Sequence, residues 1–436
     1  MRNLKRALSL ALAAIMLVGM MVVSASAASY NDLTDKDQIV NKDAVSMLVS
    51  LGIIEGKPDG SYAPTENVDR AQMAKMLSVI MNKGVDNSAL YQSVNSGLVD
   101  VNTNWAKGHI NYCYTTGIIA GRGNGKFDPS ATVTALEAAK MLLVAVGYDP
   151  AIEGFEGADW AINVSVRADE QGIFEGFTKD LSAPLNRDDA ALLIYNALDV
   201  EMIQSYTTNN YPIVYSDHRT ILSDKYGVIK VEGVVTANEW AILDDDTDTA
   251  LQEGKTRIYN PDGILSTTGN TAVAQDSSAN VKTQVFNVST PVDMLGKAVT
   301  MYVKKTTILA DSTVYGAPVV SDVNTVIETG EKVTGGDSKD DDSLAALLKG
   351  TGLATDKATE YYHNYEEVAI DSADVDDIMN VKGAALTVID NDNDGYVNYV
   401  ISVEKSLTHV SGVSSKNETT CLLYTSDAAD DMQCVD

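Results

Sequence analysis

The sequence predicts a multidomain α + β protein, with an all-α N-terminal part made of three copies of one unit and β-rich modules after it. Two observations predict this fold class. A helix–loop–helix pattern recurs three times between residues 51 and 194, and after about residue 204 short alternating runs rich in Thr, Val, Asp and Asn replace it. The 436 residues provide enough chain for two or three domains with their own cores.

The chain is strongly acidic, with 61 Asp and Glu against 32 Lys and Arg and a formal net charge of −29. Nucleic-acid binders need clustered Lys and Arg to neutralise phosphates, so we expect no nucleic-acid partner. The same excess of carboxylates opposes adsorption to anionic lipid. Three cysteines are too few for a disulfide framework, and four histidines leave little material for a zinc enzyme.

Residues 1–27 have the pattern of a secretory signal peptide. Arg2, Lys5 and Arg6 precede an apolar run from Leu8 to Val23, and Ala25-Ser26-Ala27 is a small-residue cleavage site. The alternative is a transmembrane anchor, but the apolar run has 16 residues and a bilayer span needs about 20. We therefore expect cleavage after Ala27 and an exported chain with no membrane span after cleavage.

Three segments of the chain align with one another. Each begins with a Gly-Ile pair, has a glycine four residues later and a proline further on, and ends in a periodic apolar stretch. The segments are Leu51–Leu77, Thr116–Leu142 and Gln171–Ile194, and the initial glycines are Gly52, Gly117 and Gly172. With the helical stretches before them, they define repeats at residues 29–84, 91–148 and 152–204.

Each repeat reads as a helix, a long loop and a second helix. The glycine after the first periodic stretch is typical of a helix C-terminus. Capping boxes at Asp69–Gln72 and Thr134–Glu137 start the second helix in two copies, and Asn186 can cap the third. One helix pair cannot bury both of its apolar stripes, so we expect the three copies to pack together.

These motifs resemble the S-layer homology (SLH) family. The family's aromatic-x-Asp start, Trp-Ala pair, Asp-Gly-x-aromatic-x-Pro loop and Thr-Arg-Ala-Glu helix start have counterparts at Tyr30–Asp32, Trp105-Ala106, Trp160-Ala161, Asp59–Pro64 and Asp69–Gln72. The resemblance covers about residues 29 to 200. It implies a pseudo-threefold, three-pronged helical domain that binds secondary cell-wall polysaccharide, often pyruvylated, on peptidoglycan without a covalent bond, in grooves between repeats.

The resemblance also implies a set of ligand-binding residues. They are Asp32, Gly60, Arg70, Asp100, Trp105, Gly125, Trp160 and Arg187. The copies are not equal, because Val40 stands where the other two have tryptophan, Ala135 replaces the arginine, and the third loop is shorter and lacks Asp-Gly. We therefore expect one or two good grooves rather than three.

The arginines and tryptophans allow two interpretations each. Arg70 and Arg187 follow a helix cap, where free backbone N–H groups and the helix dipole favour an anion, but a surface arginine can also simply pair with a neighbouring acid. Trp105 and Trp160 can act as sugar platforms or as core anchors. Large aromatic residues are mostly buried, so the core interpretation is favoured.

The second half reads as a β-rich module at 205–333, an acidic linker at 334–343 and a smaller β-rich module at 344–415. Expected strands lie at 228–235, 284–288, 298–303, 366–370, 385–389 and 397–403. The last two flank Asp390-Asn-Asp-Asn-Asp-Gly395, where Asp390, Asp392 and Asp394 offer oxygens at the alternate positions that suit Ca²⁺. The alternative is a metal-free hairpin turn, and Ile401 at the twelfth position excludes an EF-hand.

The last residues, 421–436, resemble translated sequencing-adaptor read-through, and we expect a non-native tail there. The native protein would then continue past about Thr420, with Cys113 as its one native thiol.

Catalytic motifs are missing from the sequence, and no Asp/Glu pair can be singled out among so many acids. We expect a non-enzymatic S-layer or adhesive component at the bacterial cell surface, with possible self-association and with no cofactor apart from a structural Ca²⁺. The alternative is a wall-anchored polysaccharide-active enzyme whose catalytic domain lies in a missing C-terminal part.

Overall fold

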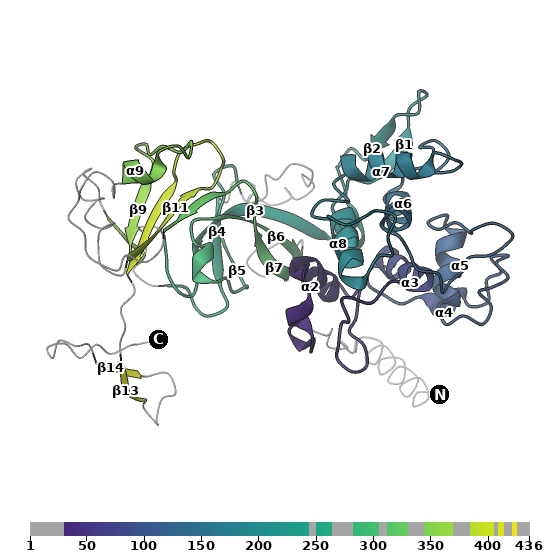
Figure 1. Ribbon diagram of the computed structural model, residues 1–436, viewed down its shortest axis with the longest axis horizontal. Helices are drawn as coiled ribbons and strands as arrows, with labels where there is room; N and C mark the ends of the chain where they lie inside the picture. The colour runs from purple at the N-terminus through teal and green to yellow at the C-terminus, as the bar shows by residue number, and fades with distance from the viewer. Residues whose placement is uncertain are drawn as a thin grey trace, which may run out of the picture.

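The structure, a computed structural model, describes residues 30–243, 250–263, 282–304, 312–329, 344–368, 384–404, 409–413 and 421–424. The predicted signal peptide, the acidic linker and residues 425–436 lie outside them. The described chain is a mixed α and β protein. In Figure 1 the helices gather at one end, coloured purple to teal, and the sheets lie at the other, coloured teal to yellow.

The helices of the N-terminal part follow the predicted repeats. Their bounds are α2 (Lys42–Ser50), α3 (Arg70–Met81), α4 (Ser88–Tyr91), α5 (Lys107–Thr115), α6 (Ala135–Val146), α7 (Trp160–Glu170) and α8 (Arg187–Leu198), with 3₁₀ turns at Tyr30–Asp32 and Lys36–Gln38. The first helices end before Gly52, Gly117 and Gly172, which all have positive φ. The predicted capping boxes of Asp69 and Thr134 are present, and the Asn186 side chain caps α8. Local sequence signals therefore placed both helices of each repeat correctly.

A ring of three backbone hydrogen bonds joins the repeats at their centre. Val68 N–H donates to the Leu185 carbonyl at 2.8 Å, Leu185 N–H donates to the Val133 carbonyl at 2.8 Å, and Val133 N–H donates to the Val68 carbonyl at 2.9 Å. Each of these residues is buried and lies two positions before the first residue of α3, α6 or α8. The ring therefore holds the starts of the three second helices together.

The second helices lie inside and the first helices pack around them. The first helix of one repeat packs against the second helix of another, in the pairs α5 on α3, α7 on α6 and α2 on α8. One hydrophobic core runs through all three repeats, including Met73 and Leu77 of α3, Leu142 of α6 and Ile194 of α8. Each apolar stripe is thus buried by a neighbouring repeat, as expected for units that cannot bury it alone.

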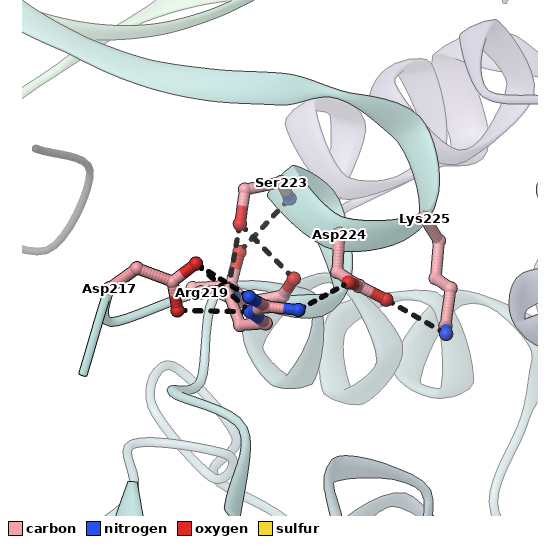
Figure 2. Close-up of polar contacts among 6 residues, drawn as sticks. Asp217, Arg219, Ser223, Asp224 and Lys225 are labelled. Carbon is pink, nitrogen blue, oxygen red and sulfur yellow. Dashed lines mark hydrogen bonds and ion pairs between the residues drawn. The ribbon is translucent and has the colours of Figure 1, made fainter. Parts of the chain in front are cut away.

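A structured connector leads from the helical part to the first sheet. It contains a β-ribbon of β1 (Ile203–Tyr206) and β2 (Pro212–Val214), and a single wide helical turn, η3 (Leu222–Tyr226). Figure 2 shows Arg219 between the carboxylates of Asp217 and Asp224. Its Nη2 lies 2.8 Å from one oxygen of Asp217, its Nη1 lies 3.2 Å from Asp224, and Lys225 pairs with Asp224 at 2.8 Å. This network lies on the segment that leads into β3.

The first sheet is antiparallel, with strand order β5-β4-β3-β6-β7. Its strands are β3 (Val228–Ala237), β4 (Thr256–Tyr259), β5 (Thr283–Phe286), β6 (Ala298–Lys304) and β7 (Val314–Val320), with a 3₁₀ turn at Val292–Met294 before β6. The sheet touches the helical part directly: β7 packs against α2, and the rings of Tyr195 on α8 and Tyr302 on β6 meet edge to face at 5.9 Å. The predicted strands at 228–235, 284–288 and 298–303 coincide with β3, β5 and β6.

The second sheet has the order β10-β9-β12-β11-β8. Its strands are β8 (Thr325–Glu328), β9 (Glu360–His363), β10 (Glu366–Glu367), β11 (Ala384–Asp390) and β12 (Tyr399–Glu404); the helix α9 (Leu344–Leu348) packs beside it, and a separate pair, β13 (His409–Val413) and β14 (Cys421–Tyr424), follows. All its pairings are antiparallel except β12 with β9.

The two sheets do not divide at the predicted linker. β8, expected in the first module, pairs with β11 of the second sheet, and residues 321–324 carry the chain to it from β7. A shared core also joins the sheets, with Val231 and Met301 from the first and Tyr362, Ile389 and Ile401 from the second. The described β region is therefore one packed unit rather than two modules.

Candidate functional site

Arg70, the first residue of α3, reaches from the first repeat into the second. Its Nε donates to the Phe127 carbonyl at 2.8 Å and its Nη2 donates to the Ala120 carbonyl at 2.9 Å. The guanidinium carbon also lies 4.4 Å from the centre of the Phe127 ring. Only 4% of the residue is exposed, so Arg70 is not the solvated surface arginine that was one alternative.

Arg187, the first residue of α8, makes the same contacts from the third repeat to the first. Its Nε donates to the Tyr62 carbonyl at 2.7 Å, its Nη2 donates to the Glu55 carbonyl at 3.3 Å, and the guanidinium lies 4.7 Å from the Tyr62 ring centre. Both arginines therefore bridge two repeats. Since Nε and Nη2 already bind protein carbonyls, Nη1 is the nitrogen of each guanidinium that has no hydrogen-bond acceptor among the described residues.

The Arg70 junction, which we define as the contact of the α3 start with α6, α7 and the loop 118–122, encloses a pocket of about 390 Å³. Arg70 and Trp160, both predicted ligand residues, line this pocket from different repeats. The charged residues that share its wall are Arg122, Glu137, Lys140 and Glu156. Tertiary structure thus brings a buried guanidinium and an indole ring from residues 90 positions apart to one cavity.

Arg122 and Lys140, two of the charged residues around this pocket, make specific contacts with other residues of its wall. Arg122 pairs with Glu137 at 2.7 Å. The ammonium of Lys140 lies 5.7 Å from the Trp160 ring centre and donates to the Phe155 carbonyl at 2.5 Å. Burial lowers the pKa of Lys140, and Glu156 opposes that shift. Three cations against two carboxylates leave the wall locally positive, which suits an anionic ligand on a protein that is acidic overall.

The Arg187 junction is the corresponding contact of the α8 start with α3, α5 and the loop 53–57. Lys57 pairs with Glu66, and Lys75 of α3 lies 3.7 Å from Glu55. Lys75 corresponds to Lys140 and Lys57 to Arg122 in the alignment of the repeats. Trp105, two residues before α5, aligns with Trp160. The residue types of the first junction therefore recur here in the aligned sequence.

The Ala135 junction is the third contact, of the α6 start with α8, α2 and the loop 173–181. Here Ala135 replaces the arginine, Leu192 replaces the lysine and Val40 replaces the tryptophan. These three departures lie in three different repeats, and the packing of α2 on α8 brings them to one junction.

Two buried carboxylates at the start of α8 contact the segments that form the Ala135 junction. Asp188 accepts hydrogen bonds from Val40 N–H at 3.3 Å and from Asn41 N–H at 3.2 Å, and Asp189 pairs with Lys179 at 2.6 Å. Burial raises the pKa of Asp188. This junction thus joins the first repeat to the third. Its carboxylates would repel an anionic ligand.

The two tryptophans differ in exposure. Trp105 is 58% exposed, and Trp160 is half-buried in the pocket wall. The preference for core anchors is therefore wrong for Trp105. The preference rested on the average burial of tryptophan, which says nothing about a helix start at the edge of a junction.

Asp100 binds the loop of its own repeat. Its carboxylate accepts from the backbone N–H groups of Phe127 at 3.0 Å and Asp128 at 2.8 Å. Burial alone would raise the pKa of Asp100, but these donors bring it below its usual value.

In the first repeat the carboxylate that binds the loop is Asp35, whereas Asp32 was predicted as a ligand residue. Asp35 accepts from Tyr62 N–H and Ala63 N–H, both at 2.7 Å, whereas Asp32 lies exposed in the first 3₁₀ turn. The spacing contained the signal, because Asp35 lies five residues before Val40 as Asp100 lies five before Trp105. A ligand contact by Asp32 stays a prediction.

Gly60 and Gly125 hold the same loop position in two repeats. Their φ angles are +83° and +67°, in the left-handed region that favours glycine. The Gly60 carbonyl accepts from Thr34 N–H at 3.0 Å, and the Gly125 carbonyl accepts from Val99 N–H at 2.8 Å. Both glycines therefore fix the loop against the segment that carries Asp35 or Asp100.

The acidic turn before β12 brings Asp390, Asp392 and Asp394 together, with one oxygen of each within 4.8 Å of the others. Asp390 is buried, and its carboxylate already accepts from Asn393 N–H at 2.8 Å and Gly395 N–H at 3.1 Å. Burial and the charges of Asp394 and Asp390 raise the pKa of Asp392. The oxygens suit Ca²⁺ in type, but the turn is also completed by its own backbone, so calcium stays a prediction.

Comparison with known proteins identifies the repeats. The S-layer homology domain family matches residues 29–74 and 99–139. The chain is 26% identical over 394 residues to a cell surface protein of Thermoanaerobacter kivui, which covers 90% of this chain and 44% of that protein. It is 32% identical over 113 residues to an S-layer protein of Bacillus licheniformis, covering 26% of this chain and 12% of the relative.

An enzyme is also among the relatives. An amylopullulanase of Thermoanaerobacterium thermosulfurigenes is 30% identical over 185 residues, covering 39% of this chain and 10% of the enzyme. The chain spans less than half the length of each of these relatives. Of the helices that the structure describes, none combines the length and apolarity that a bilayer crossing requires. The repeats, the two family matches and the relatives agree, and the chain is a cell-surface protein with S-layer homology domains.

Proposed function

We propose that residues 29–200 hold an exported protein to secondary cell-wall polysaccharide without a covalent bond, and that the ligand carries carboxylates such as pyruvyl groups. The observation that carries this proposal is the Arg70 pocket, where Arg70, Arg122 and Lys140 line one cavity with Trp160. A carboxylate pairs with such cations, and a sugar ring packs on an indole face.

The balance of charge favours recognition at short range. The chain carries a net charge of −29, so an anionic polymer gains nothing from the overall field. Salt screens charges beyond about 8 Å at physiological ionic strength, which leaves the local cations of a junction to decide binding. Nη1 of the Arg70 guanidinium and the ammonium of Lys140 are the donors that we assign to ligand.

We further propose that the repeats form a pseudo-threefold domain with two competent sites. The hydrogen-bond ring of Val68, Leu185 and Val133 supports the symmetry. The Arg70 and Arg187 junctions keep an arginine, a lysine and a tryptophan, whereas the Ala135 junction has lost all three and contains buried Asp188. Ligand should therefore bind at the first two junctions and not at the third.

The β region would then be displayed from the wall, in a surface-layer or adhesive component that can associate with itself. The relatives named as cell surface and S-layer proteins support this role. A second candidate function is that of a wall-anchored enzyme. The amylopullulanase supports it, as does an exoglucanase of Acetivibrio thermocellus that is 29% identical over 186 residues. Sequencing the gene downstream of codon 420 distinguishes them, since a catalytic domain there would favour the enzyme.

A wall-binding experiment tests the anchoring proposal. The chain without residues 1–27 is mixed with purified bacterial cell walls, and with the same walls after the secondary polymer has been removed. We expect recovery with native walls and little with stripped walls. Equal recovery with both, or none with either, would refute polymer binding.

A further inference from the structure

His109 lies beside the exposed Trp105, which we assign to the Arg187 junction from the alignment of the repeats. It lies on α5, four residues after Trp105, which precedes the helix, and the two ring centres are 6.4 Å apart at an interplanar angle of 65°. The histidine is 3% exposed and the tryptophan 58%. In Figure 1, α5 lies beside α3, which supplies the other wall of this contact. The imidazole therefore supports one side of an indole that faces solvent.

The polar partners of His109 come from α3 and the segment after it. Nδ1 lies 2.6 Å from the Ser78 hydroxyl, and Nε2 lies 3.7 Å from a carboxylate oxygen of Asp86. The Ser78 hydroxyl also lies within hydrogen-bond distance of the Lys75 carbonyl, at 2.9 Å. When the hydroxyl donates to that carbonyl, its oxygen can accept from Nδ1–H of His109, and Nε2 then faces Asp86.

Protonation would complete this arrangement. The imidazolium has N–H groups on both nitrogens, and here one meets the Ser78 oxygen and the other meets the Asp86 carboxylate. Burial and the ammonium of Lys75 oppose the charge, while Asp86 favours it, and the pKa of His109 lies below its ordinary value. His109 is therefore neutral at pH 7 and gains its proton at a lower pH than an ordinary imidazole does.

The contact resembles a Ser-His-Asp triad only in composition. Ser78 is 4% exposed, and its hydroxyl has a backbone carbonyl of its own helix within hydrogen-bond distance. A nucleophile must be open to its substrate, so this burial argues against a nucleophilic role.

The other junctions lack such a group. Four residues after Trp160 the chain has Val164, and four residues after Val40 it has Ala44; both are buried.

We propose that His109 is a positioning residue for Trp105, and that its protonation makes anion binding at the Arg187 junction, but not at the Arg70 junction, stronger in mild acid. The binding half of this inference rests on the proposed function above. A new positive charge behind the indole strengthens its contact with the ring and adds to the attraction for an anionic ligand.

Fluorescence tests the positioning contact without any ligand. The chain has three tryptophans, so a Trp160→Phe, Trp240→Phe variant leaves Trp105 as the one indole reporter. We expect its emission to fall between pH 7.5 and 5, because a protonated imidazole quenches an adjacent indole. His109→Val, which copies the residue at the other junction, and His109→Asn, which keeps a polar group without a titratable proton, should both abolish the pH dependence. An unchanged pH profile in both would overturn the inference.

Binding tests the coupling at each junction separately. The probe is a purified pyruvylated wall-polysaccharide fragment, measured by calorimetry at pH 7.5 and 5.5. In Arg70→Ala, where the Arg187 junction remains, affinity should rise roughly threefold or more in acid; it should stay flat in Arg70→Ala, His109→Asn and in Arg187→Ala. Equal pH dependence in all three would overturn the coupling. Absence of binding at both pH values would refute the polymer proposal and the coupling, while the fluorescence result would still decide the Trp105 contact.

Discussion

The guanidinium of Arg70 lies 4.4 Å from the centre of the Phe127 ring and donates from Nε to the carbonyl of that same residue at 2.8 Å. Arg187 and Tyr62 repeat the relationship between the third repeat and the first, at 4.7 Å and 2.7 Å. Each arginine thus bridges two repeats, whether or not it also binds the proposed ligand. Any mutation there acts on the assembly of the junction as well as on binding.

Arg70→Ala and Arg187→Ala should each weaken wall binding. Each change removes two hydrogen bonds from a charged donor and one positive charge, a loss of about 1.5–3 kcal/mol per site, or roughly ten- to a hundredfold in affinity. Arg70→Lys should rescue only part of the loss, since an ammonium cannot make both bonds and stack on Phe127. Calorimetry with the wall fragment measures this. Lys83→Ala, which removes an exposed charge from the first repeat, is the control and should bind as the parent does.

Asp35→Ala should destabilise the helical part, and Asp32→Ala should not. Asp35 accepts two backbone hydrogen bonds at 2.7 Å, and removing a charged acceptor leaves these donors without it. The expected loss is about 1–3 kcal/mol in the free energy of unfolding, against about 0.5 or less for the exposed Asp32. Urea denaturation followed by circular dichroism compares the two. Equal midpoints for both variants would contradict the assignment of Asp35.

Asp199 should make the contact between α8 and the first sheet sensitive to pH. Burial raises its pKa to about 6, although Lys230, 3.9 Å away, favours the charged form. A raised folded-state pKa means that stability is gained as the pH falls from above 6 toward the unfolded value of 3.8, and is lost as the pH rises through 6. The side chain is 28% exposed, so we discount the full shift and expect about 1 kcal/mol.

Asp199→Asn should therefore be more stable than the parent at pH 7.5, and the difference should shrink toward pH 5. Denaturant unfolding at both pH values measures it. Asp322→Asn, at an exposed position near the same contact, serves as the matched control and should show no such trend. A variant less stable than the parent at pH 7.5 would show that the charged form is favoured after all.

The calcium prediction for the Asp390 turn requires a rise in the thermal midpoint when Ca²⁺ replaces a chelator, because an ion that binds only the folded state stabilises it. Asp392→Asn combined with Asp394→Asn should remove the rise, since these carboxylates complete the candidate ligand set. Asp390 stays unchanged in this test because it holds the turn through the backbone of Asn393 and Gly395. Coincident midpoints with and without calcium would leave a metal-free hairpin turn.

The sequence by itself determined the local structure of the repeats. Gly52, Gly117 and Gly172 end the first helices, and Asp69, Thr134 and Asn186 cap the second helices where the capping patterns predicted them. These signals act over three or four residues, so the adjacent sequence determines where each helix begins and ends. The strands of the β region at 228–235 and 385–389 were found for the same reason, through alternation along a short run.

Only the tertiary structure decided how the repeats meet. It brought Val40, Ala135 and Leu192, where three different repeats depart from the pattern, to the Ala135 junction. It also placed Arg70 and Trp160 on the wall of one pocket. It also moved β8 into the second sheet and showed that Asp35 binds the loop of the first repeat as Asp100 does in the second. Contacts between residues tens of positions apart depend on which helix packs against which and on where a loop carbonyl or N–H finds its partner. The periodicity of the sequence predicts neither the packing partner of a helix nor the hydrogen-bond partner of a loop.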